Sequence, residues 1–71
     1  MNKILVFKTN LTNKKKVEGA KRAIEKIPGI IQWNVDIQDC DKILRIETLD
    51  LSAKTIEKHL LLSGFLCEEL I

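Results

Sequence analysis

The side chains that could do chemistry in this chain are few. A polar and basic stretch at 10–16, Asn-Leu-Thr-Asn-Lys-Lys-Lys, lies between an apolar run and a helical pattern, and elsewhere there are two single cysteines, Cys40 and Cys67, and one histidine, His59. These residues form no nucleophile–base set, no paired acids and no glycine-rich phosphate loop. We therefore expect no enzymatic activity and no bound cofactor.

The two cysteines do not form a CxxC pair, which excludes a zinc ribbon and a thioredoxin-type motif. Cys40 lies between two predicted strands, where we expect an exposed or half-buried thiol. Cys67 falls on the core-facing alternation of the last predicted strand, where a free cysteine acts as a small hydrophobe. A disulfide between them stays open at this point. The low cysteine content, with no targeting segment after Met1, favours a cytoplasmic location.

Composition limits the classes of partner. The chain has 71 residues, 45% of them hydrophobic and 31% charged, which is typical of one small globular domain. A net charge of +2 is too low to indicate nucleic acid as a partner. The longest apolar runs are far shorter than a membrane span. We therefore expect neither nucleic-acid binding nor membrane insertion.

Six short segments carry the hydrophobic patterns of regular structure. In chain order they predict a strand at 3–8, a helix at 14–26, strands at 31–38 and 42–48, a helix at 53–63 and a strand at 65–70. Asn13 and Ser52 are the expected N-caps. Pro28-Gly29 and Gly64 are expected to end the two helices.

This order predicts an α+β fold with the ferredoxin-like βαββαβ arrangement, formed by one domain over 1–71. Right-handed crossovers would place both helices on one face of a four-stranded antiparallel sheet. The strand at 3–8 has apolar side chains on both of its faces, so it should lie in the centre of the sheet. The strand directions would then bring the connections at 10–14, 38–42 and 63–65 to one end of the molecule.

From about Asn10 to Phe65 the chain resembles the heavy-metal-associated domain, the fold of small copper chaperones and of the N-terminal domains of metal-transporting P-type ATPases. The family pattern runs Gly-Met-x-Cys-x-x-Cys, a helix ending in Leu-x-Gly-Val, a Val-Asn/Asp-Leu strand, and a helix ending in Gly-Tyr. The matching residues here are Ala23-Ile24, Ile27, Gly29-Ile30, Val35-Asp36-Ile37, Ile56, Leu60 and Gly64-Phe65, with one residue of difference at 39–41.

The departures from the family pattern lie in the functional loop. Asn13 takes the place of the first cysteine and Lys16 that of the second, while Asn10 takes the glycine place, Leu11 the buried methionine place and Phe65 the tyrosine place. The resemblance implies two thiolates for a soft cation such as Cu(I). A neutral amide oxygen and a cationic ammonium cannot replace them, so we expect no metal at Asn13 and Lys16.

Two interpretations of Lys16 stay open. The Lys16 ammonium could supply the positive charge that a metal brings to this loop in the family, or it could be a solvated lysine in the first helical turn, which we favour. Cys40 remains a possible weak metal ligand at the same end of the fold.

Two surfaces are candidates for a protein contact. Lys14, Lys15 and Lys16 open the first helix, where cations oppose the macrodipole, and the resemblance implies docking by complementary charge there, with Phe65 beside it. The alternative for the lysines is a solvated face.

The second candidate surface belongs to the sheet. We expect Leu5 or Phe7, Ile43 and Leu66 on or near its helix-free face. That face, or the edge strand carrying Trp33, would form a homodimer or a partner contact.

The sequence therefore favours a non-catalytic interaction or regulatory module that lacks the thiolate pair. One alternative is a metal-ion binding or transport protein that uses Cys40 or a partner chain. A second is a general ferredoxin-like binder of a small ligand or RNA, which would need aromatic rings on the open face of the sheet, where only Phe7 is a candidate.

Overall fold

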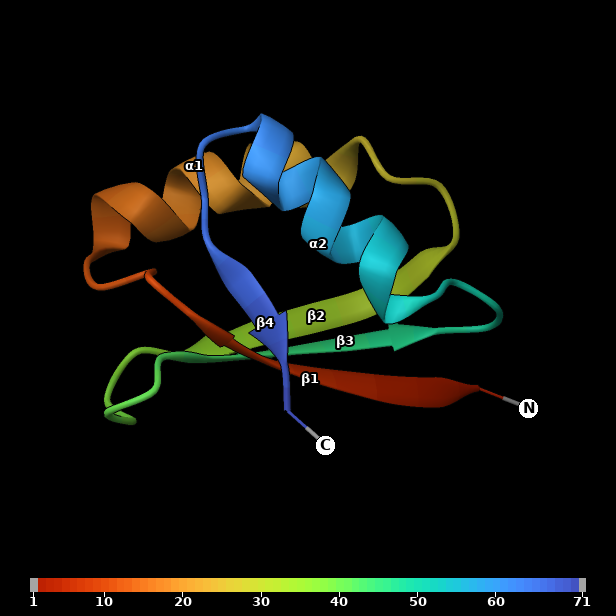
Figure 1. Ribbon diagram of the computed structural model, residues 1–71, viewed down its shortest axis with the longest axis horizontal. Helices are drawn as coiled ribbons and strands as arrows, with labels where there is room; N and C mark the ends of the chain where they lie inside the picture. The colour runs from red at the N-terminus through yellow and green to blue at the C-terminus, as the bar shows by residue number, and fades with distance from the viewer. Residues whose placement is uncertain (1, 71) are drawn as a thin grey trace.

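The computed structural model describes residues 2–70 and contains the six predicted elements in the predicted order (Figure 1). The strands and helices are β1 (Lys3–Thr9), α1 (Lys14–Glu25), β2 (Ile30–Asp36), β3 (Ile43–Thr48), α2 (Ala53–Leu62) and β4 (Cys67–Glu69). Within residues 2–70, no helix has the length and apolar character needed to span a membrane.

The four strands form one antiparallel sheet in the order β2-β3-β1-β4. Both helices cover the same face of this sheet, and the other face carries no helix (Figure 1). The ferredoxin-like fold and the central position of β1 are therefore confirmed.

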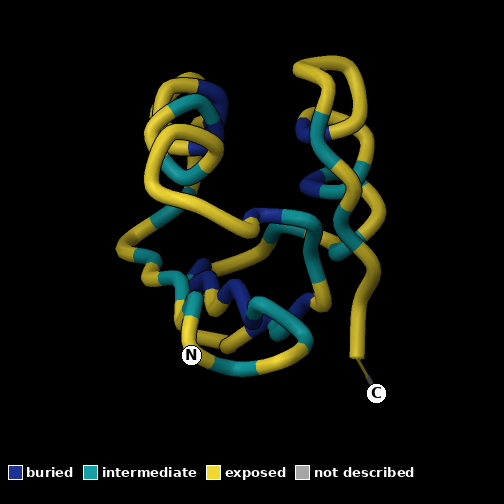
Figure 2. The backbone as a smooth tube through the Cα atoms, turned by 90° about the vertical axis from the view of Figure 1, so that its left-hand side faces the viewer, coloured by how far each residue is buried: buried dark blue, intermediate teal, exposed yellow. Residues whose placement is uncertain are grey.

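The core lies between the helices and the sheet, where the buried segments gather in an end-on view (Figure 2). Its largest fully buried apolar side chains come from β1, the following loop, α1, β3 and α2, namely Phe7, Leu11, Ile24, Leu44, Ile46, Ile56 and Leu60. The predicted apolar stripe of α1 is confirmed, with Ala20, Ala23 and Ile24 buried.

The expectation that Leu5 or Phe7 of β1 points to the helix-free face is wrong. Leu5 pairs with Ile46 and Phe7 pairs with Leu44, and all four side chains are buried in the helix-covered core. The helix-free face of β1 carries Ile4 instead, which is 57% exposed. Both alternating sets of this strand are apolar, so the pattern alone could not select the inward face.

The expected exposure of Ile43 also needs correction. Ile43 is only 7% exposed, so little of it is left for a partner. In β2 the pairing with β3 shifts between Ile30 and Gln32, which makes Ile31 the extra residue of a bulge. Ile30 therefore packs against the core, while Ile31 is 48% exposed.

The helix ends follow the predicted capping chemistry. The side chains of Asn13 and Ser52 accept hydrogen bonds from the third residue of each helix. Gly64, at φ 91°, follows α2 and its N–H donates to the Leu61 carbonyl. Phe65 N–H donates to the Leu60 carbonyl at 2.8 Å, which completes a Schellman motif.

The connections around β3 and β4 differ from the predicted ones. The Asp36 carboxylate accepts from Gln38 N and Asp39 N, so β2 ends at Asp36 and the loop to β3 is longer than predicted. β4 is shorter than predicted because Phe65 N–H belongs to the helix cap and Leu66 N–H donates to the Asn10 side chain.

We predict that the Phe65 ring leaves no room for a side chain at position 19 of α1. Replacing an interior helical glycine by alanine usually stabilises a protein by about 1 kcal/mol. Here the new Cβ would lie 2.7 Å from Phe65 Cζ. We therefore expect Gly19→Ala to lose that gain in the wild-type background and to regain it in Phe65→Ala. Urea unfolding of the four proteins measures the coupling. An equal gain in both backgrounds would contradict the contact.

Candidate functional site

Three connections meet at the end of β1, as their topology predicts. Thr9 N–H donates to the Asp41 carbonyl at 3.1 Å, and the Thr9 hydroxyl donates to the Lys42 carbonyl. The next residue, Asn10, donates its N–H to the Leu66 carbonyl at 3.2 Å. The last two residues before the loop thus hold the β2–β3 turn on one side and the start of β4 on the other.

Asn10, which occupies the glycine place of the family pattern, closes the loop toward β4. Its Oδ1 accepts from Leu66 N at 3.0 Å, in addition to the backbone bond in the opposite direction. Leu11, in the methionine place, is 1% exposed and belongs to the core, as expected. The hydrogen bonds of Asn10 and the burial of Leu11 therefore fix the backbone at the start of the loop.

Asn13, in the place of the first cysteine, has a structural task. It is the N-cap of α1, and its Oδ1 accepts from Lys16 N at 2.9 Å. The same oxygen is the atom that the side chain would have to offer to a cation. A loss of this cap costs about 1 kcal/mol in typical proteins, so the bond competes directly with any ligand role.

Lys16, in the place of the second cysteine, is exposed, and so are Lys14 and Lys15. The first turn of α1 contains no acidic residue to offset these three cations. Positive charge at a helix N-terminus opposes the macrodipole. The loop therefore combines a neutral, already bonded oxygen with an ammonium group. This donor set does not fit a soft cation, which selects thiolates.

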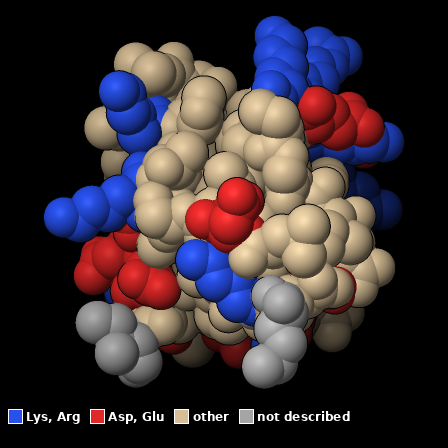
Figure 3. Space-filling view, turned by 90° about the vertical axis from the view of Figure 1, so that its right-hand side faces the viewer, with Lys and Arg blue, Asp and Glu red and all other residues tan. Residues whose placement is uncertain are grey.

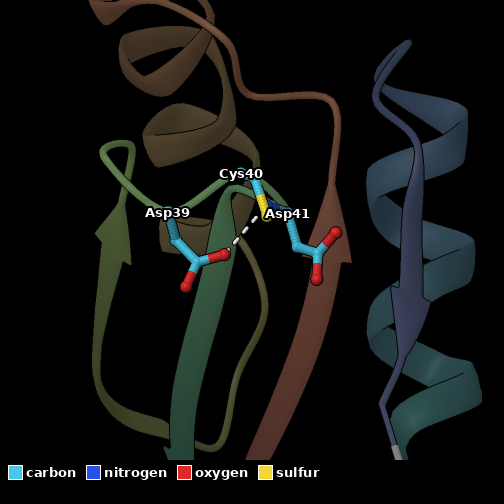
Figure 4. A group of neighbouring side chains, drawn as sticks. All are labelled: Asp39, Cys40 and Asp41. Atoms are coloured by element: carbon cyan, nitrogen blue, oxygen red, sulfur yellow. Dashed lines mark hydrogen bonds between the residues drawn. The ribbon is translucent and has the colours of Figure 1, made fainter.

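Cys40 lies in the turn between β2 and β3, at the same end of the molecule. Figure 4 shows its thiol between the carboxylates of Asp39 and Asp41, and the ligand atoms of the three side chains lie within 4.8 Å of one another. Cys40 is exposed. Asp39 Oδ1 accepts from Asp41 N at 2.8 Å, so the turn uses this carboxylate to hold its own backbone.

The two flanking carboxylates are the part of this end that sequence analysis missed. The signal was present, because Asp39 and Asp41 are adjacent to Cys40 in the chain. Lys8 Nζ approaches Asp41 Oδ1 at 4.0 Å between exposed side chains, a separation that contributes little stability.

Cys67 lies on β4, is half-buried and packs against the core, as predicted. Burial raises the pKa of its thiol to about 12, and the nearby Glu57 carboxylate adds to the rise. A thiol with this pKa is a poor nucleophile and a poor metal ligand near neutral pH. Cys40 and Cys67 are both free, so no disulfide joins them.

Phe65 is half-buried and packs against the core, with its ring tip over Gly19 of α1. Gly19 lies one helical turn after Lys15 and Lys16, so the ring lies beside the face of α1 that carries these two lysines. His59 is exposed on α2. The structure therefore groups Phe65 with the lysines and leaves His59 apart.

Figure 3 shows the opposite end of the molecule, where acidic and basic side chains of the described residues lie next to each other, including an acidic and a basic group near the middle of the view. The basic first turn of α1 is thus a local feature of the end where the three connections meet.

We predict that the two thiols differ strongly in reactivity. At pH 8 on the order of one Cys67 side chain in 10,000 is a thiolate if its pKa is about 12. Iodoacetamide should therefore modify exposed Cys40 and leave Cys67 intact until the protein is unfolded in urea. Mass spectrometry of peptides reports both sites. Labelling of the two cysteines at equal rates in the native protein would contradict the burial of Cys67.

No protein-family model matches the sequence, and no curated protein matches it either. Solved structures do match. Oxidised MerP from Ralstonia metallidurans CH34 superposes with a TM-score of 0.86 at 15% identity, over 100% of both chains.

Two copper proteins are similar to a comparable degree. The Cu(I)-loaded first domain of the human copper chaperone for superoxide dismutase gives a TM-score of 0.81 at 16% identity, over 97% of this chain and 93% of that one. The yeast copper transporter domain Ccc2A gives 0.80 at 13% identity, over 96% and 94%. At such identities a likeness shows the fold alone, and the fold of this chain is that of the heavy-metal-associated domain.

Proposed function

We propose that this chain is a non-catalytic interaction module built on the heavy-metal-associated fold, with a loop that keeps its shape without a metal. The observation that carries the proposal is the bond from Lys16 N to Asn13 Oδ1 at 2.9 Å. At the two places where the family pattern has thiolates, the chain has a helix cap and a cation. The loop is thus held by the groups of the protein itself.

The contact surface that we propose is the exposed first turn of α1. Lys14, Lys15 and Lys16 are exposed and have no acidic neighbour in that turn. Phe65 lies beside this face over Gly19 and would form its apolar border. Three exposed lysines, two of them on the face beside the half-buried ring, suit a partner surface rich in carboxylates, because complementary charge steers association and fixes orientation.

Of the two alternatives, RNA binding has lost its main support. It required an aromatic ring on the helix-free face, and Phe7, the candidate, is completely buried on the other face. Metal binding through Cys40 can be told apart from metal binding by the loop, because the exposed Cys40 thiol lies outside residues 10–16 and can be replaced separately.

We predict that the wild-type protein takes up no Cu(I) through residues 10–16. Anaerobic titration against a chromogenic Cu(I) chelator measures this directly. Any residual binding should disappear in Cys40→Ser and should be unchanged in Asn13→Ala. A one-to-one complex that survives Cys40→Ser and is lost in Asn13→Ala would contradict the proposal.

Restoring the two thiols should restore the metal site. In Asn13→Cys with Lys16→Cys, two thiols three residues apart would stand at a helix N-terminus, which lowers thiol pKa values. We expect this double variant to compete with the chelator for Cu(I), whereas the matched control Asn13→Ser with Lys16→Ser should not. A folded double-cysteine variant without Cu(I) binding would show that the backbone of the loop has also changed.

A further inference from the structure

The two edges of the sheet differ in how far they are closed. β4 forms one edge and β2 the other. Leu70 N–H donates to the Val6 carbonyl, so by alternation the N–H of Glu69 points away from β1. Glu57 of α2 accepts that N–H at 2.8 Å. The β4 edge is therefore short, acidic and capped by a side chain.

The β2 edge is longer, and within residues 2–70 no side chain is seen to cap its outer backbone groups. Among residues 2–70, β2 pairs with β3 alone, and its outer backbone groups face no other strand. Its sequence is Ile-Ile-Gln-Trp-Asn-Val-Asp, in which Asp36 is the only charged residue. Natural edge strands are usually protected by charged residues, proline or a bulge. The bulge at Ile31 interrupts only the first part, which leaves 32–36 regular.

A shallow groove of about 350 Å³ lies along this edge, between the end of α1 and β2. Ile24, Ile27, Ile30, Ile31 and Trp33 line it together with the carboxylate residue Glu25 and the amide residue Gln32. The edge thus offers unpaired backbone together with a groove of mixed apolar and polar lining.

We propose that the β2 edge binds the β2 edge of a second copy of this chain, antiparallel about a twofold axis at Asn34. The two four-stranded sheets would form one continuous sheet with all helices on one face. This contact is separate from the lysine surface of α1, and it requires no metal.

The register follows from side-chain complementarity. With Asn34 opposite Asn34 of the second copy, Trp33 lies opposite Val35 and Gln32 lies opposite Asp36. Trp33 and Val35 both pack toward the helix-covered core, so they form an aromatic–β-branched pair on that side. Gln32 and Asn34 are exposed on the other face. There the Asn34 amide of one copy would meet the Asn34 amide of the other, and each Gln32 amide would meet the Asp36 carboxylate of the other copy.

The same register brings the end of β2 in one copy, at Asp36, next to the groove that Gln32 lines in the other copy. No like charges oppose each other in this register, because Asp36 is the only charge in the strand. Self-pairing of β4 would instead bring together the acidic pairs Glu68 and Glu69 of both copies. The geometry therefore selects β2 and a second copy of the chain.

Cysteine cross-linking tests the axis. In a Cys40→Ser background, Asn34→Cys places one thiol from each copy on the twofold axis, within the Cα separation that a disulfide needs. We expect diamide to convert Asn34→Cys into a covalent dimer more than about tenfold faster than Gln32→Cys, since only thiols that face each other can join. Gln32 is the matched control, because it is exposed on the same strand and face, two residues from the axis.

Sedimentation gives the second measurement. Wild type should dimerise with rising concentration into the high micromolar range, and Asn34→Lys should be monomeric there because two cations would meet on the axis. The control Glu68→Lys, on the closed edge, should dimerise like wild type. A wild type that stays monomeric, or equal cross-linking of Asn34→Cys and Gln32→Cys, would overturn the proposal. Neither outcome bears on the metal titration or the lysine surface, so the two proposals can fail separately.

Discussion

The end of β1 is the constraint on which the rest of this structure depends. Thr9 and Asn10 form hydrogen bonds to the β2–β3 turn and to the start of β4, segments that are far apart in the chain. Just before them, Phe7 is fully buried under the helices, and just after them Leu11 is 1% exposed. With both flanking side chains in the core, the loop between β1 and α1 has little freedom. The positions of Asn13 and of the first helical turn follow from this.

In this setting the two asparagines of the loop have a consistent physical role. Asn13 supplies a cap to α1, and Asn10 supplies a side-chain acceptor to Leu66 N. Both amides satisfy backbone donors that would otherwise be free at a helix start and a strand start. The three lysines oppose the helix dipole, but they are exposed, where solvent reduces the cost. The loop thus has the bonds it needs within the protein, and its charge faces outward.

Much of this could be predicted from the sequence, and the misses have physical causes. The helices were predictable because their apolar stripes and the caps Asn13 and Ser52 are local signals. The inward face of β1 was not, because Ile4 and Val6 are as apolar as Leu5 and Phe7. The bulge at Ile31 depends on pairing with β3, which β2 alone does not encode. The early end of β2 and the short β4 depend on side-chain bonds from Asp36 and Asn10.

The candidate site was predictable in its residues and only in part in its geometry. The places of Asn13, Lys16 and Cys40 near one end followed from topology. The carboxylates that flank Cys40 are adjacent to it in the chain, but their approach to the thiol depends on the local fold of the turn. The bond between Asn10 and Leu66 is a tertiary contact between segments far apart in the chain. The difference between the two sheet edges also needed coordinates, because Glu57 and Glu69 are on separate elements and only their contact closes the β4 edge.

We propose that the loop at 10–16 is held in place by its own hydrogen bonds. Amide hydrogen exchange of Lys16 and Leu66, measured by NMR in the presence of a metal chelator, is a direct test, because these N–H groups donate to Asn13 and Asn10. We expect that both amides are protected without metal, that Lys16 loses its protection in Asn13→Ala, and that adding Cu(I) changes neither rate in the wild type. Free exchange of both amides in the metal-free protein, with protection only after Cu(I) is added, would contradict it.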